Sequence, residues 1–480
     1  MSAIASSEGS AGGPGLAQKA TSAVEVMAQS VANIAPSAVM ATGAALIFTS
    51  AGRGTWVSYV IGTVIVLMVG YCLAQFARRS ATTGSVYSYT ARGLGGFAGF
   101  MSGWGIQVGY LAIAMGSVAG AGLYFGAFLG ELGIDGSGTG WQLAIFAVCT
   151  LGALLATMRG IRLSTRVGLV IELTSIALIL FVVVAVLVDH GFSVDSSQLS
   201  LKGTSVNGVT FGVVLAILGF VGFESAASLG VEAKDPYRAI PRAILWSALG
   251  AGLLYVLASY TQVLGLGAGL GKSGAPLGDL ASRSGIGWVN PVIDLGITAS
   301  FFACAAASVN ASARILYTMG REGMMGSALG RTHAEHQTPH VAIALLAPLL
   351  FAAPAAIVLA GSQALEALAY LGTIGTFGFM VAYALVSVAA PVWLARIGEL
   401  RPLVMIAGPL SAAAMVYVFY KNVVPAPPSP FNVLPWVFAS LMALGAAWYG
   451  AVRIAAPARV AAVGSAMSDD PAPAVAVTAG

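Results

Sequence analysis

Two carboxylates lie in the middle of long apolar stretches, where a charged side chain is unusual. Glu224 follows the stretch 218–223, and Glu172 lies inside the fifth long apolar run of the chain. If these runs cross a membrane, each buried carboxylate costs about 3 kcal/mol and commonly marks a binding or proton-carrying site. We therefore predict that Glu224 and Glu172 belong to a functional site, with a purely structural hydrogen-bond anchor as the alternative. Asp294 and Glu366 lie nearer the ends of their runs and are expected at the membrane interface.

The composition supports a membrane location for these runs. Of 480 residues, 58% are hydrophobic and only 8% are charged, whereas soluble domains have about 25% charged residues. The net charge of +4 is too weak to indicate nucleic-acid binding. Cys72, Cys149 and Cys304 all lie in apolar runs, so neither a disulfide framework nor a metal site is expected. No nucleophile–base arrangement is visible, and we predict no catalytic residue, no cofactor and no enzymatic activity.

The lengths of the apolar runs predict an all-α membrane protein with twelve transmembrane helices. A membrane-spanning helix needs about 20 apolar residues. Twelve such runs begin near Ser22, Trp56, Gly96, Trp141, Ser164, Gly208, Pro241, Asn290, His340, Ala364, Pro402 and Leu434. We predict three parts: a disordered cytoplasmic tail over residues 1–20, a transporter domain over 21–455 and a second disordered cytoplasmic tail over 456–480.

The distribution of basic residues predicts the orientation of these spans. With twelve spans and a cytoplasmic N-terminus, seventeen of the 22 Lys and Arg residues fall on the cytoplasmic side. The five that fall outside are Arg53, Lys202, Lys272, Arg283 and Lys421. Because cytoplasmic loops are enriched in Lys and Arg, both termini are expected in the cytoplasm of a multi-pass protein of the cell (plasma or inner) membrane.

Two of the predicted spans are interrupted. Span 1 contains Pro36 close to Asn33, and span 6 contains Gly219 and Gly222 beside Glu224. Proline removes a helical hydrogen bond, and unpaired backbone at membrane depth is tolerated only where it is buried in protein or lines a cavity. Interruptions at matching places in two halves of a chain indicate the binding site of a transporter. Spans 1 and 6 match if five helices are followed by five of inverted topology.

Four segments resemble those of the amino acid–polyamine–organocation (APC) superfamily of permeases. Residues 222–224 followed by 232–241 are similar to that family's span 6 signature, which reads G-F-E/D and then E-E-x-K-N-P-x-R-x-I-P. Residues 83–89 with 103–104, residues 159–164 and residues 314–323 are similar to its segments near spans 3, 5 and 8. The resemblance covers about residues 20–455. It implies an amino acid permease with twelve helices, of which the first ten form a LeuT-like five-plus-five inverted repeat with broken helices 1 and 6.

The chain departs from the family pattern at several positions. Val231 replaces the first Glu of the usual pair, and Asp235 replaces the usual Asn. The lysine that serves proton coupling in some members would fall near Ser175, so the coupling ion stays open between H⁺ and Na⁺. The tryptophan that some exchangers carry in span 6 would fall near Leu218, and its absence weakens the case for an arginine-type exchanger.

A helix broken at membrane depth offers an amino acid both of the partners it needs. Free N–H groups at the start of a half-helix suit a carboxylate, and free C=O groups at the end of the other half suit an ammonium. We therefore predict a substrate site formed by Asn33, Ile34, Ala35, Pro36, Ser37, Ala38, Gly109, Tyr110, Leu218, Phe220, Val221 and Gly222. The amides of Ser37 and Ala38 and the Ser37 hydroxyl are expected to hold the carboxylate. A bulky residue at Gly222 is expected to block the site without unfolding the protein.

The preferred interpretation is a secondary active transporter that moves an amino acid by alternating access, in proton-coupled uptake. Glu224 and Glu172 are the candidates for proton coupling, and Ser308 and Ser312 are the alternative ion ligands if sodium is the driving ion. A polyamine or organic-cation transporter or exchanger is the alternative within transport. A non-transporting membrane sensor or partner subunit on a permease scaffold is the alternative from another class. The expected partners are the small-molecule substrate, the coupling ion and the lipid bilayer.

Overall fold

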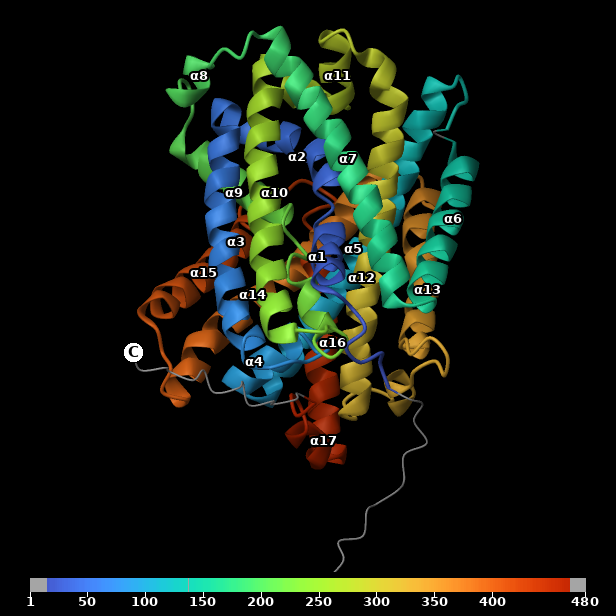
Figure 1. Ribbon diagram of the computed structural model, residues 1–480, viewed down its shortest axis with the longest axis vertical. Coiled ribbons are helices and arrows are strands. Elements are labelled where there is room, and N and C mark those ends of the chain that lie inside the picture. The colour runs from blue at the N-terminus through green and yellow to red at the C-terminus, as the bar shows by residue number, and fades with distance from the viewer. Residues whose placement is uncertain (1–14, 137, 467–480) are drawn as a thin grey trace, which may run out of the picture.

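The computed structural model describes residues 15–136 and 138–466. Within these residues the backbone is almost entirely helical, and most helices run along one common direction (Figure 1). Extended pairing among the described residues is confined to one isolated bridge between Thr21 and Ala233.

The helices fall into three groups: long helices, the parts of the two interrupted spans, and short helices in the connections. The long helices are α3 (Thr55–Ala77), α5 (Gly96–Glu131), α6 (Thr139–Met158), α7 (Ile161–Asp189), α10 (Pro236–Leu266), α12 (Asn290–Arg321), α13 (His340–Leu359), α14 (Ala364–Arg396), α15 (Pro402–Lys421) and α16 (Leu434–Ala455). The interrupted segments are α1 (Ala23–Ile34) with α2 (Pro36–Ala51), and α9 (Val206–Leu218) with the 3-10 helix η2 (Ser225–Leu229). The connections contain α4 (Val86–Leu94), α8 (Ser196–Leu199), α11 (Pro276–Arg283), α17 (Pro457–Ala461), η1 (Gly52–Gly54), η3 (Gly267–Lys272), η4 (Gly287–Val289) and η5 (Ser327–Gly330).

The predicted class, an all-helical membrane protein with interrupted first and sixth spans, is confirmed. Ten stretches of the described residues are long and apolar enough to cross a membrane. The first of them, Ala23–Ala77, joins α1, α2 and α3, and the 13-residue helix α9 is too short to be counted. Two predicted spans are thus counted as one stretch and a third is not counted, which explains why ten stretches are found where the sequence predicts twelve spans. The count of twelve stays a prediction.

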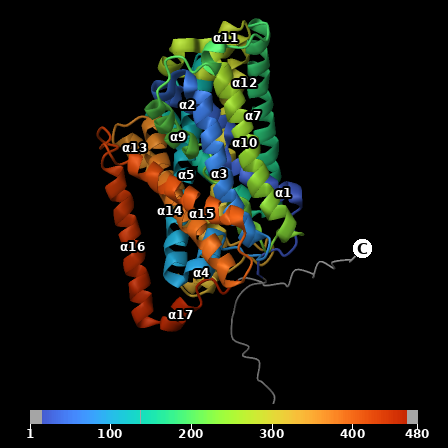
Figure 2. The ribbon, with the colours of Figure 1, turned by 90° about the vertical axis from the view of Figure 1, so that its left-hand side faces the viewer.

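Close backbone contact between α5 and α14 forms the centre of the bundle. A Cβ atom on Gly378 of α14 would lie 2.8 Å from the Gly109 amide nitrogen of α5, and a Cβ on Gly375 would lie 3.1 Å from the Gly109 carbonyl oxygen. Small residues at such a crossing let two helices approach closely in a membrane. The peripheral helix α16 stands at the edge of the bundle, where Figure 2 shows it clearly.

A buried ion pair lies near the start of α10 and the end of α12, at the lower end of the bundle in Figure 1, which is the end predicted to be cytoplasmic. Arg314 of α12 donates from Nε to Glu232 Oε2 at 2.5 Å and from Nη2 to Glu232 Oε1 at 2.9 Å. Both side chains are 1% exposed. The segment that carries Glu232 also pairs with the chain just before α1, because the Thr21 amide donates to the Glu232 carbonyl at 2.8 Å. The chain segments of the two interrupted spans that lie at this end are therefore bonded to each other and to α12.

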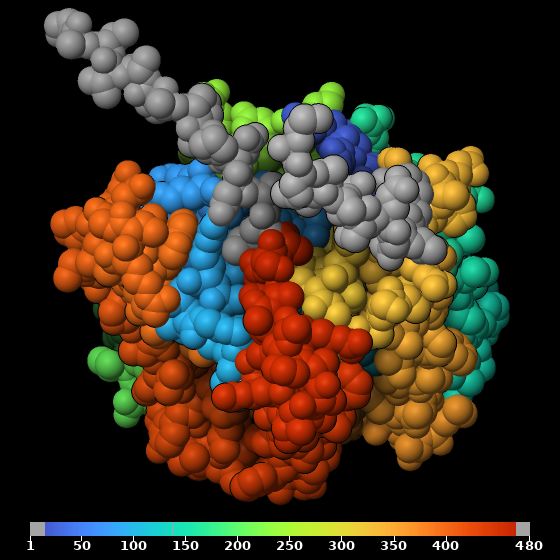
Figure 3. Space-filling view, turned by 90° about the horizontal axis from the view of Figure 1, so that it is seen from below, coloured from blue at the N-terminus to red at the C-terminus, as the bar shows by residue number. Residues whose placement is uncertain are grey.

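The described part of the predicted C-terminal tail packs on this same end. It contains α17, and the amides of Gly464 and Ala466 donate to the carboxylate of Glu322, at 3.1 and 3.0 Å. Tyr87 of α4 also donates to Glu322. In Figure 3 the red C-terminal residues lie between the light-blue and yellow parts of this face. Residues 1–14 and 467–480 of the two predicted tails lie outside the described residues, and the division into one domain and two tails stays a prediction.

Candidate functional site

The first interrupted span breaks at Ala35, between α1 and α2. Ala35 has φ 48° and ψ 60°, in the left-handed region that commonly ends a helix. Pro36 then begins α2, where the missing N–H of proline is not needed by the helix. The proline in the sequence therefore opens the second half of the span rather than kinking a continuous helix.

The second interrupted span breaks after Leu218, where α9 ends. The chain turns through Gly222, whose φ of +92° favours glycine, and continues into η2. The Tyr255 hydroxyl donates to the Gly219 carbonyl at 2.7 Å, and the Gly222 amide donates to the Tyr383 hydroxyl at 3.2 Å. Backbone groups freed by the break thus find side-chain partners, as they must at membrane depth.

Asn33 joins the two breaks. Its Nδ2 donates to the Gly222 carbonyl at 3.4 Å, and its Oδ1 accepts from the Ser308 hydroxyl at 2.6 Å. Its own carbonyl accepts from the Cys304 thiol at 3.2 Å. A Cβ on Gly222 would lie 2.7 Å from Asn33 Cγ. The expectation that Gly222 tolerates a bulky residue is therefore wrong, because this position has both a positive φ and an occupied space.

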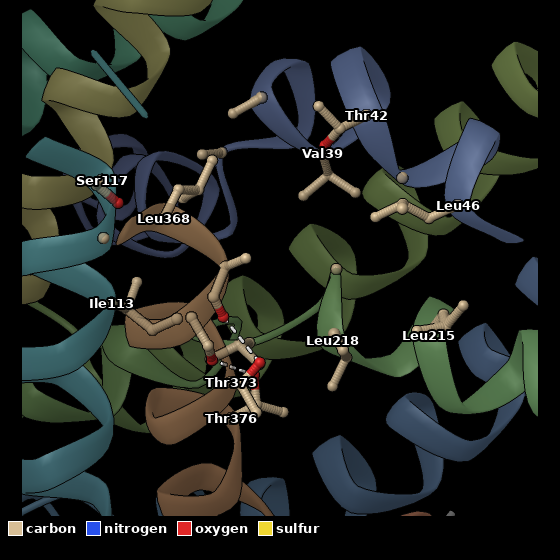
Figure 4. Close-up of a pocket in the computed structure, with 18 of the residues that line it drawn as sticks. Val39, Thr42, Leu46, Ile113, Ser117, Leu215, Leu218, Leu368, Thr373 and Thr376 are labelled. Atoms are coloured by element: carbon tan, nitrogen blue, oxygen red, sulfur yellow. Dashed lines mark hydrogen bonds between the residues drawn. The ribbon is translucent and has the colours of Figure 1, made fainter. Parts of the chain in front are cut away.

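A cavity of about 470 Å³ opens between the two breaks. One side consists of residues from α2 and α9, and the other of residues from α5 and α14 (Figure 4). The lining is largely apolar, with Val39, Leu215, Leu218 and Ile113 among its side chains. The described residues that border the cavity include no charged side chain.

Half of the predicted substrate-site residues border this cavity. They are Asn33, Ile34, Ala35, Ala38, Leu218 and Val221. Ile34 also borders an apolar crevice of about 400 Å³ on the outer surface, between α1, α7 and α10.

The other predicted residues serve the packing around the cavity. Pro36 faces the outer crevice, and Phe220 packs edge-on against Tyr255 with ring centroids 5.0 Å apart. A Cβ on Gly109 would lie 2.8 Å from the Phe379 ring, so this glycine permits close packing of α5 and α14. Tyr110 is fully buried and turned to Glu224.

Glu172 occupies the start of helix α2. Its Oε1 accepts from the Ser37 amide at 3.0 Å and from the Ser37 hydroxyl at 2.9 Å, and its Oε2 accepts from the Ser300 hydroxyl at 2.6 Å. A carboxylate at a helix N-terminus is stabilised by the partial positive charge there. Of the donors that the sequence analysis assigned to a substrate carboxylate, the amide and the hydroxyl of Ser37 are thus already engaged by a side chain of α7.

Glu224 lies just beyond the second break and is fully buried. The Tyr110 hydroxyl donates to its Oε1 at 2.5 Å, and the Tyr383 hydroxyl donates to its Oε2. Because the Gly222 amide donates to the same Tyr383 hydroxyl, this carboxylate ties α5 and α14 to the broken span.

The described residues contain no group of three or more His, Cys, Asp or Glu that could hold a metal.

Thr373 and Thr376 of α14 were missed by the sequence analysis. Both border the cavity (Figure 4). The Thr373 hydroxyl donates to the Ala369 carbonyl at 2.8 Å, and the Thr376 hydroxyl donates to the Gly372 carbonyl at 2.7 Å. A hydroxyl that donates to the backbone still has lone pairs that can accept. Their spacing by three residues on one apolar helix was the only signal in the sequence, and many buried threonines share it.

The fold and the cavity define a multi-pass membrane permease. The comparison with known families agrees: the model described as "Amino acid permease" matches residues 24–448. The chain therefore belongs to the amino acid permease family of the APC superfamily, as its span 6 segment suggested. The members are transporters, so the prediction that this protein is not an enzyme is confirmed.

Three curated relatives show the range of this family. The branched-chain amino acid permease of Bacillus subtilis is 28% identical over 356 residues, which cover 71% of this chain and 73% of that protein. The cationic amino acid transporter 4 of Mus musculus is 27% identical over 358 residues, 70% of this chain and 54% of its own length. The serine/threonine exchanger of Bacillus subtilis is 26% identical over 314 residues, 63% of this chain and 69% of that protein. The relatives support amino acid transport and differ in substrate.

Proposed function

We propose that this permease takes up a neutral amino acid with an apolar side chain by alternating access, in symport with a proton. The observation that carries the proposal is the apolar cavity that begins at the two helix breaks. A substrate enclosed there would leave water, so any charge on its side chain would need a charged partner. The described lining offers none.

The same observation disfavours the alternatives with a cationic substrate. A polyamine or a cationic amino acid would need a carboxylate facing the cavity. Glu224 and Glu172 are both 0% exposed, and their oxygens are engaged by Tyr110, Tyr383, Ser37 and Ser300. The name of the Bacillus subtilis branched-chain amino acid permease is consistent with an apolar substrate.

We place the charged ends of the amino acid at the first break. The carbonyl of Ile34 and the hydroxyl oxygens of Thr373 and Thr376 are the acceptors we assign to its ammonium. The start of α2 at Ala38 is the part we assign to its carboxylate, because helix N-termini favour anions. Ser37 would then act indirectly, through Glu172.

Glu172 and Glu224 remain the candidates for the coupling proton. Each lies at one of the two helix breaks, where gain or loss of a proton changes hydrogen bonds that hold a half-helix. Sodium is the alternative, with Ser308 and Ser312 as ligands. The Ser308 hydroxyl donates to Asn33, and the Ser312 hydroxyl accepts from Gln107.

The proposed location is the cell membrane, with both termini in the cytoplasm. A test introduces single cysteines at Ser197 in the 195–207 loop and at Ser465 near the C-terminus. We expect an impermeant thiol reagent to label the first on intact cells and the second only after lysis. The reverse pattern would contradict the orientation.

Transport itself is tested in proteoliposomes. We expect an inwardly directed proton gradient to drive uptake of leucine, valine or isoleucine without sodium, and arginine and spermidine not to compete. Strict sodium dependence would contradict proton coupling. Competition by arginine or spermidine at concentrations similar to leucine would contradict the substrate class.

A further inference from the structure

The loop between α15 and α16 borders the cavity, although these two helices lie outside the ten that the family resemblance assigns to the inverted repeat. Asn422, Pro427 and Phe431 belong to the cavity lining. All three are partly buried, whereas Val424 and Val433 in the same loop are 42% and 50% exposed. The loop thus turns selected side chains inward, toward the hollow between α2 and α14.

Phe431 is held in place by α14. Its ring packs edge-on against Tyr370, with centroids 5.2 Å apart and an interplanar angle of 72°. Tyr370 lies in the same stretch of α14 as Leu368, Ala369 and Gly372, which line the cavity. The Phe431 carbonyl also accepts from the Leu434 amide at 3.2 Å, at the start of α16. Tyr370 therefore contacts the ring, and the first turn of α16 holds the backbone that carries it.

The proline content of the loop restricts its backbone conformation. Residues 425, 427, 428 and 430 are prolines, and each proline fixes its own φ near −65°. A chain with so little backbone freedom loses little entropy when it is ordered against a neighbour. A bulky ring carried on such a loop resists displacement by a ligand more than a ring on a flexible loop would.

We infer that Phe431 is a specificity-determining residue, which limits the size of the substrate side chain that the cavity accepts. The inference rests on the proposed function of the cavity. Leu46 of α2 and Leu215 of α9 form the lining contributed by the opposite side. The apolar side chain of an amino acid whose charged ends lie at the first break would extend into the space between those leucines and Phe431.

The test compares amino acids of increasing size. Dissociation constants of alanine, leucine, phenylalanine and tryptophan are measured on the purified full-length chain in detergent. The variants are Phe431→Ala and Phe431→Trp, with Val433→Ala as the matched control from the same loop. The melting temperature of each variant checks folding.

The quantity compared is the dissociation constant of alanine divided by that of tryptophan. We expect Phe431→Ala to raise this ratio about tenfold above the wild-type ratio, because one or two methylene equivalents in an apolar pocket are worth about that much. Phe431→Trp should shift the ratio in the opposite direction, and Val433→Ala should leave it unchanged. Equal ratios in wild type and both Phe431 variants would overturn the inference.

A further variant separates this inference from the proposed function. Gly372 borders the cavity, and a Cβ there would meet nothing within 4 Å. If Gly372→Leu blocks binding while the Phe431 variants keep the wild-type ratios, only the role of Phe431 is wrong. If no amino acid binds to folded wild-type protein, or if Gly372→Leu binds as wild type does, the proposed function fails.

Discussion

Removing one partner of the buried Arg314–Glu232 pair should destabilise the protein far more than removing both. The Arg314 side chain is 1% exposed, and in Glu232→Met its guanidinium would keep, among the described residues, its contacts with Asn310, including the Nη1 bond to the carbonyl at 2.9 Å. An unpaired buried charge of this kind costs about 3–5 kcal/mol. In the double variant with Arg314→Met, neither charge of this pair remains, and most of that cost should disappear.

The expected shift in melting temperature follows from the length of the chain. An unfolding entropy of about 2.1 cal/mol/K per residue gives roughly 1 °C per kcal/mol for 480 residues. Glu232→Met should therefore melt about 3–5 °C below wild type, and Glu232→Met/Arg314→Met within about 2 °C of it. The measurement is thermal unfolding in detergent, followed by intrinsic fluorescence. The single variant Arg314→Met is measured as well. A double variant whose melting temperature falls by the sum of the shifts of Glu232→Met and Arg314→Met would refute the reasoning, because the two side chains would then not be coupled.

Three further predictions follow from single contacts. Burial raises the pKa of the Glu322 carboxyl above its ordinary value, so its contribution to stability is complete below that ordinary pKa and is lost as the pH rises through the raised one. The melting temperature of Glu322→Gln should accordingly gain on that of wild type as the pH rises from below the ordinary pKa of Glu to neutral, and a constant difference would contradict this. Cys304 borders the cavity, so bound leucine should slow its alkylation by N-ethylmaleimide, as peptide mapping would show; an unchanged rate at saturating leucine would count against the site. A Cβ on Gly378 would lie 2.8 Å from the Gly109 amide nitrogen, so Gly378→Leu should yield no folded protein on purification, whereas Gly372→Leu on the same helix should. Recovery of equal amounts of the two folded variants would contradict the close packing of α5 and α14.

The helix breaks could be predicted from the sequence because single residues cause them. Pro36 cannot donate a helical hydrogen bond, and the glycines of span 6 permit the positive φ seen at Gly222. These local effects do not depend on tertiary contacts. The sequence therefore located six residues of the cavity lining: Asn33, Ile34, Ala35, Ala38, Leu218 and Val221.

The partners of the predicted site residues could not be predicted in the same way. Ser37 and Glu172 are 135 residues apart and meet only because α7 packs against α1 and α2. The proline-rich loop that carries Phe431 has no apolar periodicity that would indicate an inward-facing ring. Contacts of this kind depend on how helices that are distant in the sequence pack together. The local pattern of one sequence does not contain this information.

The central claim is that the cavity between the two breaks binds the substrate, and a single glycine tests it most directly. Gly372 of α14 borders the cavity, and a Cβ there meets open space. Gly450 of α16 also has open space around a Cβ and lies outside the cavity lining, so it provides the matched control. Binding of radiolabelled leucine to purified Gly372→Leu and Gly450→Leu is compared with wild type, with the melting temperature as the check on folding. We predict that Gly372→Leu folds and loses binding while Gly450→Leu binds as wild type does. Wild-type binding by folded Gly372→Leu would contradict the account.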